Sequence, residues 1–130
     1  MESISYVYDV KHYSMTNNKF EEFTTEQQQI ASITKVLSHP ARIAIIQLLS
    51  EKREIKTGNI SDDLPISRTT VSQHLKALKE MGIIKGTIDG LRIHYCLDMA
   101  KLDEIRKTYN KFFDSTIHAF LCECDCKTSI

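Results

Sequence analysis

The chain has 130 residues and a mass of 14.9 kDa, with 42% apolar and 26% charged residues. This length predicts one domain whose core is large enough to fold without a disulfide or a structural metal, so no cofactor is expected for folding. Four glycines and two prolines are too few for an all-β protein with many hairpins, and the apolar fraction is too high for disorder. We therefore expect a mainly α protein.

The patterns of hydropathy and charge limit where the protein can be located and what it can bind. The longest apolar runs are four residues, at 43–46 and 119–122, which is too short for a membrane span, and the first residues lack the apolar core of a signal peptide. We expect a soluble, cytoplasmic protein with no membrane partner. The net charge is zero, but residues 38–97 hold nine Lys/Arg and six Asp/Glu, a local excess of +3. That excess permits a polyanionic partner but is too small to identify one.

The N-terminal part of the chain divides into an arm and a series of helices. Residues 1–24 show no helical period and are expected to form an N-terminal arm that is either disordered or a short strand. From Thr25 onward, apolar residues recur at steps of three and four, which predicts a helix that ends just before Pro40. Ser38 is expected to cap the next helix, with Pro40 in its first turn. Residues 58–65 have room for only a short helix.

A capped helix and a hairpin follow. Ser67 is the expected N-cap and Gly82 the expected stop of a helix of roughly four turns. Residues 84–97 predict two strands joined by Asp89 and Gly90, a dipeptide favoured in type I′ turns. The face of the helix that is expected to be buried carries Val71, Leu75 and Leu78.

A long last helix completes the expected domain. It begins near Met99, and its apolar positions follow a near-heptad seam of Leu102, Ile105, Tyr109, Phe112, Thr116 and Phe120. We expect this domain to span residues 25–121. Residues 122–130 are expected to form a C-terminal tail that contains cysteines.

The outer face of the capped helix is polar and suited to nucleic acid. A helix of this size fits the major groove, where Gln pairs bidentately with adenine and Arg with guanine. Hydroxyl groups and the helix N-terminus reach phosphates. The same pattern on an isolated helix would also suit a solvated surface. The candidate DNA-binding residues are Ser67, Arg68, Thr69, Thr70, Ser72, Gln73 and Lys76.

The order of the expected elements favours the DNA-binding interpretation. A helix, a short helix, a turn, a capped helix, a hairpin and a last helix follow one another as in a winged helix-turn-helix. The hairpin places Arg92 near a loop tip, where a wing touches a backbone phosphate or the minor groove. We therefore predict that residues 25–121 form a mainly α winged helix-turn-helix domain with a small β-hairpin wing, which binds double-stranded DNA.

Three segments resemble the ArsR/SmtB repressors: residues 37–42 (LSHPAR), 66–78 (ISRTTVSQHLKAL) and 82–84 (GII). The similarity covers roughly residues 26–121. It implies a homodimeric repressor that binds an imperfect palindrome and releases it when an effector binds. The family dimerises through its first and last helices, which agrees with the aromatic seam of the last helix.

The cysteines lie elsewhere than in the best-known sensors of that family. Arsenic and cadmium sensors often carry Cys-x-Cys in the short helix ahead of the recognition helix, but residues 58–63 contain no cysteine. The Asp and His pattern of the zinc sensors finds only a loose fit around His118. The candidate metal-binding thiols are instead Cys122, Cys124 and Cys126, with Cys96 in the wing as a candidate fourth. Because a step of two residues rotates a helix by about 200°, the three thiols converge only if the tail leaves the helix.

Thiolates favour soft ions, so the candidate effectors are As(III) or Sb(III), Cd(II), Zn(II) and Cu(I). The resemblance to family members with cysteines near the C-terminus favours arsenite. In this interpretation, effector binding changes the packing of the dimer and releases the operator. The alternatives are a repressor of the same family that senses oxidation through a reversible disulfide or persulfide, and a tail without an effector role.

Two other classes of protein were weighed against a repressor. An enzyme would need a cleft and an orienting group around a nucleophilic Cys122 or Cys124 served by His118, and no such constellation is visible, so we expect no catalysis. A phosphate-binding loop is also absent, since the chain has only four glycines. A winged-helix module that binds proteins remains an alternative, which the polar, basic face of residues 68–79 argues against.

Overall fold

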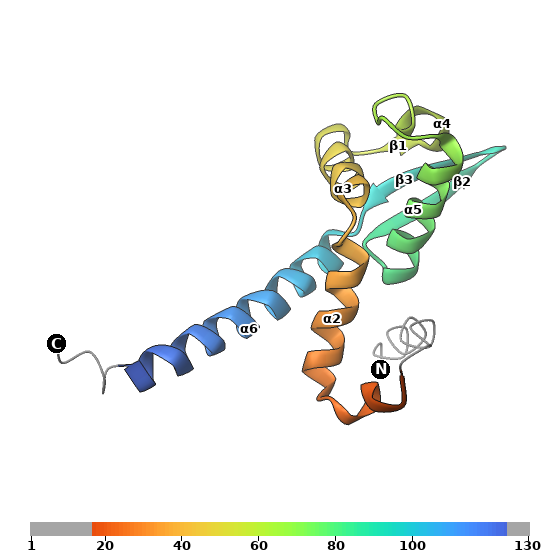
Figure 1. The fold of residues 1–130 in the computed structure, drawn as a ribbon. Helices are drawn as coiled ribbons and strands as arrows, with labels where there is room; N and C mark the ends of the chain where they lie inside the picture. Colours follow the sequence, from red (N-terminus) through yellow and green to blue (C-terminus); the bar gives the residue numbers. More distant parts are fainter. Residues whose placement is uncertain (1–16, 125–130) are drawn as a thin grey trace.

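The computed structural model describes residues 17–124 as a helical body with a small sheet, from which one long helix extends (Figure 1). This is the mainly α winged helix-turn-helix architecture that the sequence predicts. No helix among the described residues is long and apolar enough to cross a membrane. In chain order, the elements are the 3₁₀ helix η2 (Asn17–Glu22), helices α2 (Thr25–Leu37) and α3 (Pro40–Lys52), strand β1 (Ile55–Lys56), helices α4 (Thr57–Ile60) and α5 (Arg68–Met81), strands β2 (Ile84–Asp89) and β3 (Arg92–Leu97), and helix α6 (Met99–Cys124).

Short-range hydrogen bonds set the ends of α2 and α5. The hydroxyl of Thr24 accepts from the Gln27 amide at 3.2 Å, and the Gln27 side chain accepts from the Thr24 amide at 3.0 Å, which forms a capping box. Ser67 caps α5, and Gly82 ends it with a φ of +83°, both as predicted. Of the predicted N-terminal arm, residues 17–24 lie within the described part and hold η2 and the cap of α2; the rest of the arm lies outside it.

The predicted cap of α3 is wrong. Ser38 closes α2 instead, because its hydroxyl donates to the Lys35 carbonyl at 2.7 Å. His39 is the N-cap of α3, and its Nδ1 accepts from the Ala41 amide at 3.1 Å. The physical reason is Pro40, which restricts the residue before it to an extended conformation, and an extended residue is what an N-cap requires.

The wing is a three-stranded antiparallel sheet in the order β1–β3–β2. The sequence did not predict β1, because two residues carry no period. The turn is one residue away from its predicted place: Asp89 pairs with Arg92, so the loop consists of Gly90 and Leu91. Gly90, the first loop position, has a φ of +62°, whereas Leu91, the second, has no positive φ, which fits a type II′ turn rather than the predicted type I′ turn.

One hydrophobic core joins α2, α3, α5 and the inner face of the sheet. The predicted buried face of α5 is confirmed, with Leu78 at 0% exposure. The inner face of β3 also packs as its alternation indicates, since Tyr95 is buried and its neighbours on that face pack against the core. The core side chains that are almost fully buried are Ile33, Ile45, Leu49, Ile60, Val71, Leu75, Leu78, Ile83 and Ile84.

Helix α6 packs on the body only along its first half (Figure 1). Ile105 is buried, and the Tyr109 hydroxyl lies 2.9 Å from the hydroxyl of Thr34 on α2. The helix continues to Cys124, three residues beyond the predicted domain limit at 121. Its second half has exposed apolar side chains, namely Phe112, Phe113, Ile117, Phe120 and Leu121.

Candidate nucleic-acid interface

The outer face of α5 carries most of the predicted DNA-binding side chains. The side chains of Arg68, Thr69, Ser72 and Gln73 are exposed, and these side chains form no hydrogen bond or ion pair with another described residue. Lys76 is also exposed, and its ammonium lies 4.0 Å from Glu80 one turn further along the helix. These groups therefore face outward with their donors available, as contacts to base edges and phosphates require.

Ser67 and Thr70 shape the start of α5. The Ser67 hydroxyl accepts from the Thr70 amide at 3.3 Å and lies 2.9 Å from the Thr70 hydroxyl. Thr70 is half-buried, whereas Ser67 is exposed. Both predicted residues thus belong to the N-terminus of a helix, where backbone amides attract anions.

The turn before α5 is fixed from both sides. Lys52, at the end of α3, forms an ion pair of 2.6 Å with Asp63 in the loop that follows α4. Leu64 and Ile66 pack against the core in the residues that lead to α5. The turn therefore holds α5 at a defined place against α3, as a helix-turn-helix requires.

The wing carries the remaining predicted contact. Arg92 is exposed at the start of β3, next to the two-residue loop at the tip of the hairpin. His94, two residues further on, lies 2.6 Å from a Glu54 carboxylate oxygen and 3.5 Å from one of Asp89. Because Glu54 precedes β1 and Asp89 ends β2, these contacts tie the outer face of the wing together. The sequence indicated the hairpin but not this anchoring.

A second histidine makes contacts on the buried side of α5. His74 is on the buried face of α5, and its Nδ1 accepts from Arg42 Nε at 3.2 Å. The ring of His39 lies 4.3 Å from the His74 ring, centroid to centroid. Burial, followed by the positive fields of His39 and Arg42, lowers the pKa of His74. The sequence analysis missed this cluster, although His74 falls three residues after Val71 on the apolar face.

The two candidate thiols that the structure describes, Cys96 and Cys122, do not lie together. Cys96 is half-buried in β3, whereas Cys122 is exposed near the far end of α6. Between Met99 and Cys122, α6 rises by about 35 Å, so these two thiols of one chain are far apart. Cys122 Sγ lies 3.5 Å from His118 Nδ1, one helical turn earlier.

The described part of α6 ends within the segment that contains the other two candidate cysteines. The backbone is helical through Cys124. Two residues that are two positions apart on a helix are separated by about 200° around its axis. Cys126 lies outside the described residues. Within the described part of the chain, no group of three or more His, Cys, Asp or Glu residues is placed to hold a metal ion.

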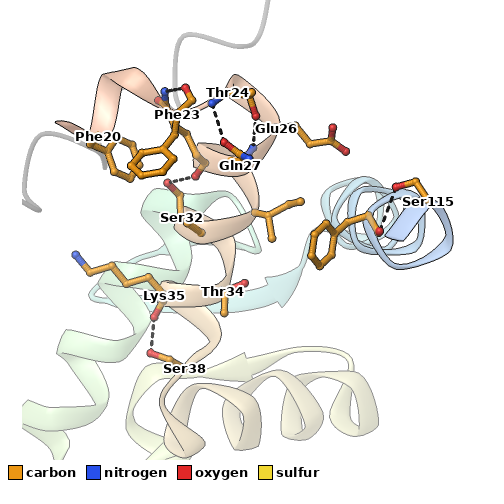
Figure 2. A pocket seen from close by; sticks show the side chains of 14 residues that line it. Phe20, Phe23, Thr24, Glu26, Gln27, Ser32, Thr34, Lys35, Ser38 and Ser115 are labelled. Carbon is orange, nitrogen blue, oxygen red and sulfur yellow. Dashed lines mark hydrogen bonds between the residues drawn. The ribbon is translucent and has the colours of Figure 1, made fainter. Parts of the chain in front are cut away.

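A groove of about 1050 Å³ lies away from α5, between η2, α2 and α6 (Figure 2). Figure 2 shows Phe20 and Phe23 together at the end formed by the short helix, with Ser115 on the facing α6. Its apolar lining also includes Ile30, Ala31 and Phe112. The groove is thus continuous with the exposed apolar side chains of α6 and separate from the exposed polar face of α5.

The chain is similar to known proteins in both sequence and fold. The profile of bacterial regulatory proteins of the arsR family matches residues 39–85. The chain is 31% identical over 85 residues to a biofilm growth-associated repressor of Xylella fastidiosa (strain Temecula1 / ATCC 700964), which covers 65% of this chain and 74% of that protein.

Two solved structures have the same architecture. A possible transcriptional regulator for arsenical resistance superposes with a TM-score of 0.58 at 29% identity, covering 68% of this chain and 92% of that one. An ArsR-like transcriptional regulator from Rhodococcus sp. RHA1 superposes with a TM-score of 0.70 at 21% identity, covering 82% of this chain and 100% of that one. The second likeness concerns the fold alone.

Proposed function

Because the chain belongs to the ArsR family of bacterial regulatory proteins, it is a DNA-binding transcription regulator, and we propose that it represses transcription by reading an operator with the outer face of α5. The observation that carries this proposal is the division of α5 into a buried apolar face and an exposed polar face. Family membership also confirms the prediction that the protein is not an enzyme.

The polar face of α5 divides into base-reading and backbone-binding groups. Gln73 and Arg68 have the bidentate donors and acceptors that match adenine and guanine in the major groove. Lys76, the amides at the N-terminus of α5 and Arg92 on the wing supply positive charge for phosphates. In this arrangement, Ser67, Thr69, Thr70 and Ser72 position the helix through their hydroxyls.

Binding measurements separate the two kinds of contact. Gln73→Ala is expected to weaken binding by about 1–3 kcal/mol at the base that it reads and to relax preference there. Lys76→Ala is expected to weaken binding to all sequences alike and to reduce the slope of log affinity against log salt by about 1. Fluorescence anisotropy on duplexes selected by the wild-type protein measures both. Unchanged binding by both variants and by Arg68→Ala would remove α5 from its proposed role.

The proposed repressor acts as a homodimer formed through α2 and α6. Support comes from the groove beside α2 and from the exposed apolar side chains that continue it along α6. An apolar stripe of this extent is typical of an interface. A two-fold axis would place the two α5 helices in successive major grooves, about 34 Å apart.

The proposed effector is a soft metal or metalloid bound by C-terminal thiolates, with arsenite favoured. Three cysteines within five residues, at 122, 124 and 126, supply the thiolates that such ions prefer. Similarity to a possible regulator for arsenical resistance supports the same choice. Because alternate positions on a helix point apart, we propose that binding unwinds the last turn of α6, which the described structure extends to Cys124.

An effector of this kind acts by favouring one arrangement of the dimer. It releases DNA only if it binds more tightly to the arrangement in which the α5 helices do not match successive grooves. Since the cysteines lie at the end of α6, which is also the proposed interface, a change there alters the packing of the two copies.

Titration of the protein–DNA complex tests the effector. The reduced protein is bound to its selected duplex, and arsenite, Cd(II), Zn(II), Cu(I) and a thiol oxidant are added separately. Release by arsenite that is lost in the Cys122→Ser, Cys124→Ser, Cys126→Ser triple variant and kept in Cys96→Ser supports the proposal. Release by the oxidant alone would identify a redox sensor, and indifference to every addition would leave a repressor without a thiol effector.

A further inference from the structure

Among the described residues, His74 is the one buried residue with a polar or charged side chain that is not part of the hydrophobic core set. It is 7% exposed and lies on the inner face of α5, between the turns that carry Ser72, Gln73 and Lys76 on the outside. A buried polar side chain costs free energy unless it is hydrogen-bonded, so its partners show what holds it there.

One guanidinium connects this histidine to two other helices. Arg42 Nε donates to His74 Nδ1 at 3.2 Å, and Arg42 Nη1 donates to the Val36 carbonyl at 3.0 Å. Arg42 belongs to the first turn of α3 and Val36 to the last turn of α2. The recognition helix is therefore joined through Arg42 to the corner between α2 and α3.

This hydrogen bond requires a neutral His74. Arg42 remains protonated and has only donors, so Nδ1 of His74 must offer its lone pair, which assigns the proton to Nε2. Nε2 is buried and has no hydrogen-bond partner among the described residues. The bond thus uses the single acceptor of the ring.

The charged surroundings also favour the neutral ring. His39 from the α2–α3 turn and Arg42 from α3 face His74, and no carboxylate of a described residue forms an ion pair with it. Burial first, then His39 and Arg42, lower the pKa of His74 from its ordinary value of 6.5. His39 uses its own Nδ1 to cap α3, so the ring that stacks on His74 is fixed in place.

We propose that Arg42 and neutral His74 are positioning residues for operator recognition, and that a proton on His74 weakens operator binding by breaking their hydrogen bond. This inference rests on the proposed role of α5 as the helix that reads the operator. A binding surface works only when its groups are held within about 0.5 Å of the productive geometry. His74 acts from beneath, and the outer side chains make the contacts.

The sign of the pH effect follows from linkage. When the hydrogen bond between Arg42 and His74 is formed, protonation of His74 is disfavoured. The arrangement of the protein that binds the operator therefore has the lower affinity for a proton at His74. The affinity for the operator is therefore fully present above about pH 6.5, the ordinary pKa of histidine, and is lost as the pH falls below that value. Nearby phosphates alone would act in the opposite direction, because they favour the protonated imidazole.

Affinity measurements against pH test the proposal. Anisotropy on the full chain uses a duplex that the wild-type protein selects from a random library and a scrambled duplex, from about pH 8 to about pH 5.5 at fixed ionic strength. The preference of the wild type for the selected duplex is expected to fall about tenfold on acidification. In His74→Asn, the amide oxygen accepts from Arg42 without titrating. This variant is therefore expected to keep its preference for the selected duplex at both ends of the pH range.

A matched histidine on another element controls for general protonation. His118→Asn, on the exposed part of α6, is expected to keep the wild-type pH profile. A wild-type profile in His74→Asn, or equal losses on both duplexes, would overturn the proposal. A purely structural role would lower the thermal midpoint and the affinity for both duplexes together, whereas positioning changes the preference at an unchanged midpoint.

A measurement on the wild-type chain avoids any dependence on how variants fold. The imidazole resonances of His74 give its pKa with and without the selected duplex, and we expect the lower pKa in the complex. An equal or higher pKa in the complex would contradict the proposal. If Gln73→Ala loses preference while His74 titrates identically in both states, the positioning role fails and the role of α5 stands; if Gln73→Ala and Arg68→Ala bind normally, the role of α5 itself fails.

Discussion

Helices α5 and α6 are both amphipathic, but only α5 has its apolar face covered by the described residues of its own chain. Leu78 on α5 is 0% exposed, whereas Phe120 on α6 is 67% exposed. On α5 the polar face is exposed to solvent. On the second half of α6 the apolar face is also exposed. The body is thus complete within one chain, whereas the second half of α6 carries an exposed apolar stripe of the kind that marks sites of association.

The largest expected effect is a loss of stability in the body of the protein, the region that is complete within one chain. Leu78→Ala removes a fully buried side chain from the core beneath α5, so the free energy of unfolding should fall by about 2–5 kcal/mol. Urea denaturation followed by circular dichroism measures the change. An exposed residue on the same helix provides the control, since Glu80→Ala should alter stability by less than about 0.5 kcal/mol. A loss below 1 kcal/mol in Leu78→Ala would show that the body is not closed around α5.

The second effect tests the incomplete region. Phe120→Glu places a charge on the exposed stripe of α6, and we expect dimerisation to weaken about 100-fold, because a buried charge without a partner is strongly disfavoured. Analytical ultracentrifugation measures the dissociation constant. Asp114→Asn, a change on another exposed position of α6, should leave it unaltered. If Phe120→Glu leaves association unchanged, the stripe of α6 has another partner.

Sequence patterns predicted the fold well wherever many residues act together. The period of three and four residues in α5, its Ser67 cap and its Gly82 stop each carry a local signal, and each is confirmed. Along β3 the residues Ile93, Tyr95 and Leu97 alternate with Arg92, His94 and Cys96, and the apolar set packs toward the core.

Features that depend on a distant partner were not predictable in this way. Strand β1 exists only because it pairs with β3, and its two residues show no period of their own. The bond between Arg42 and His74 spans 32 positions, so neither residue alone indicates it. The cap at His39 is hard to predict for a different reason: serine is the commoner N-cap residue, but Pro40 holds the residue before it in the extended conformation that a cap requires.

A smaller expected effect concerns the end of α5. Gly82 has a φ of +83°, and a Cβ there would meet only the Lys101 side chain at ordinary contact distances of 3.8 Å and more. Gly82→Ala should therefore destabilise the protein through backbone strain alone, by about 1 kcal/mol. Gly58→Ala is a fair control, because Gly58 has open space around it and no positive φ. Equal thermal midpoints for the two variants would show that the left-handed cap contributes nothing.

The smallest expected effect lies at Asp98, the residue that joins the complete and the incomplete regions. Its carboxylate accepts from the Lys101 amide at 3.1 Å at the start of α6, and its other oxygen lies 3.3 Å from Lys85 on β2. The backbone hydrogen bond from Lys101, and then Lys85, hold the pKa of Asp98 below its ordinary value of 3.8. Asp98→Asn should lower the free energy of unfolding at neutral pH by less than about 1 kcal/mol.

The pH dependence gives this last prediction its sign. A carboxyl whose pKa is lower in the folded state stabilises the fold above its unfolded value and loses that contribution as the pH falls through the folded value. The difference in stability between the wild type and Asp98→Asn should therefore be constant above about pH 5 and shrink below about pH 4. Urea denaturation at several pH values, with Asp114→Asn as the exposed control, measures it. A difference that persists unchanged into acid would mean that Asp98 joins α6 to the body by its shape and hydrogen bonds rather than by its charge.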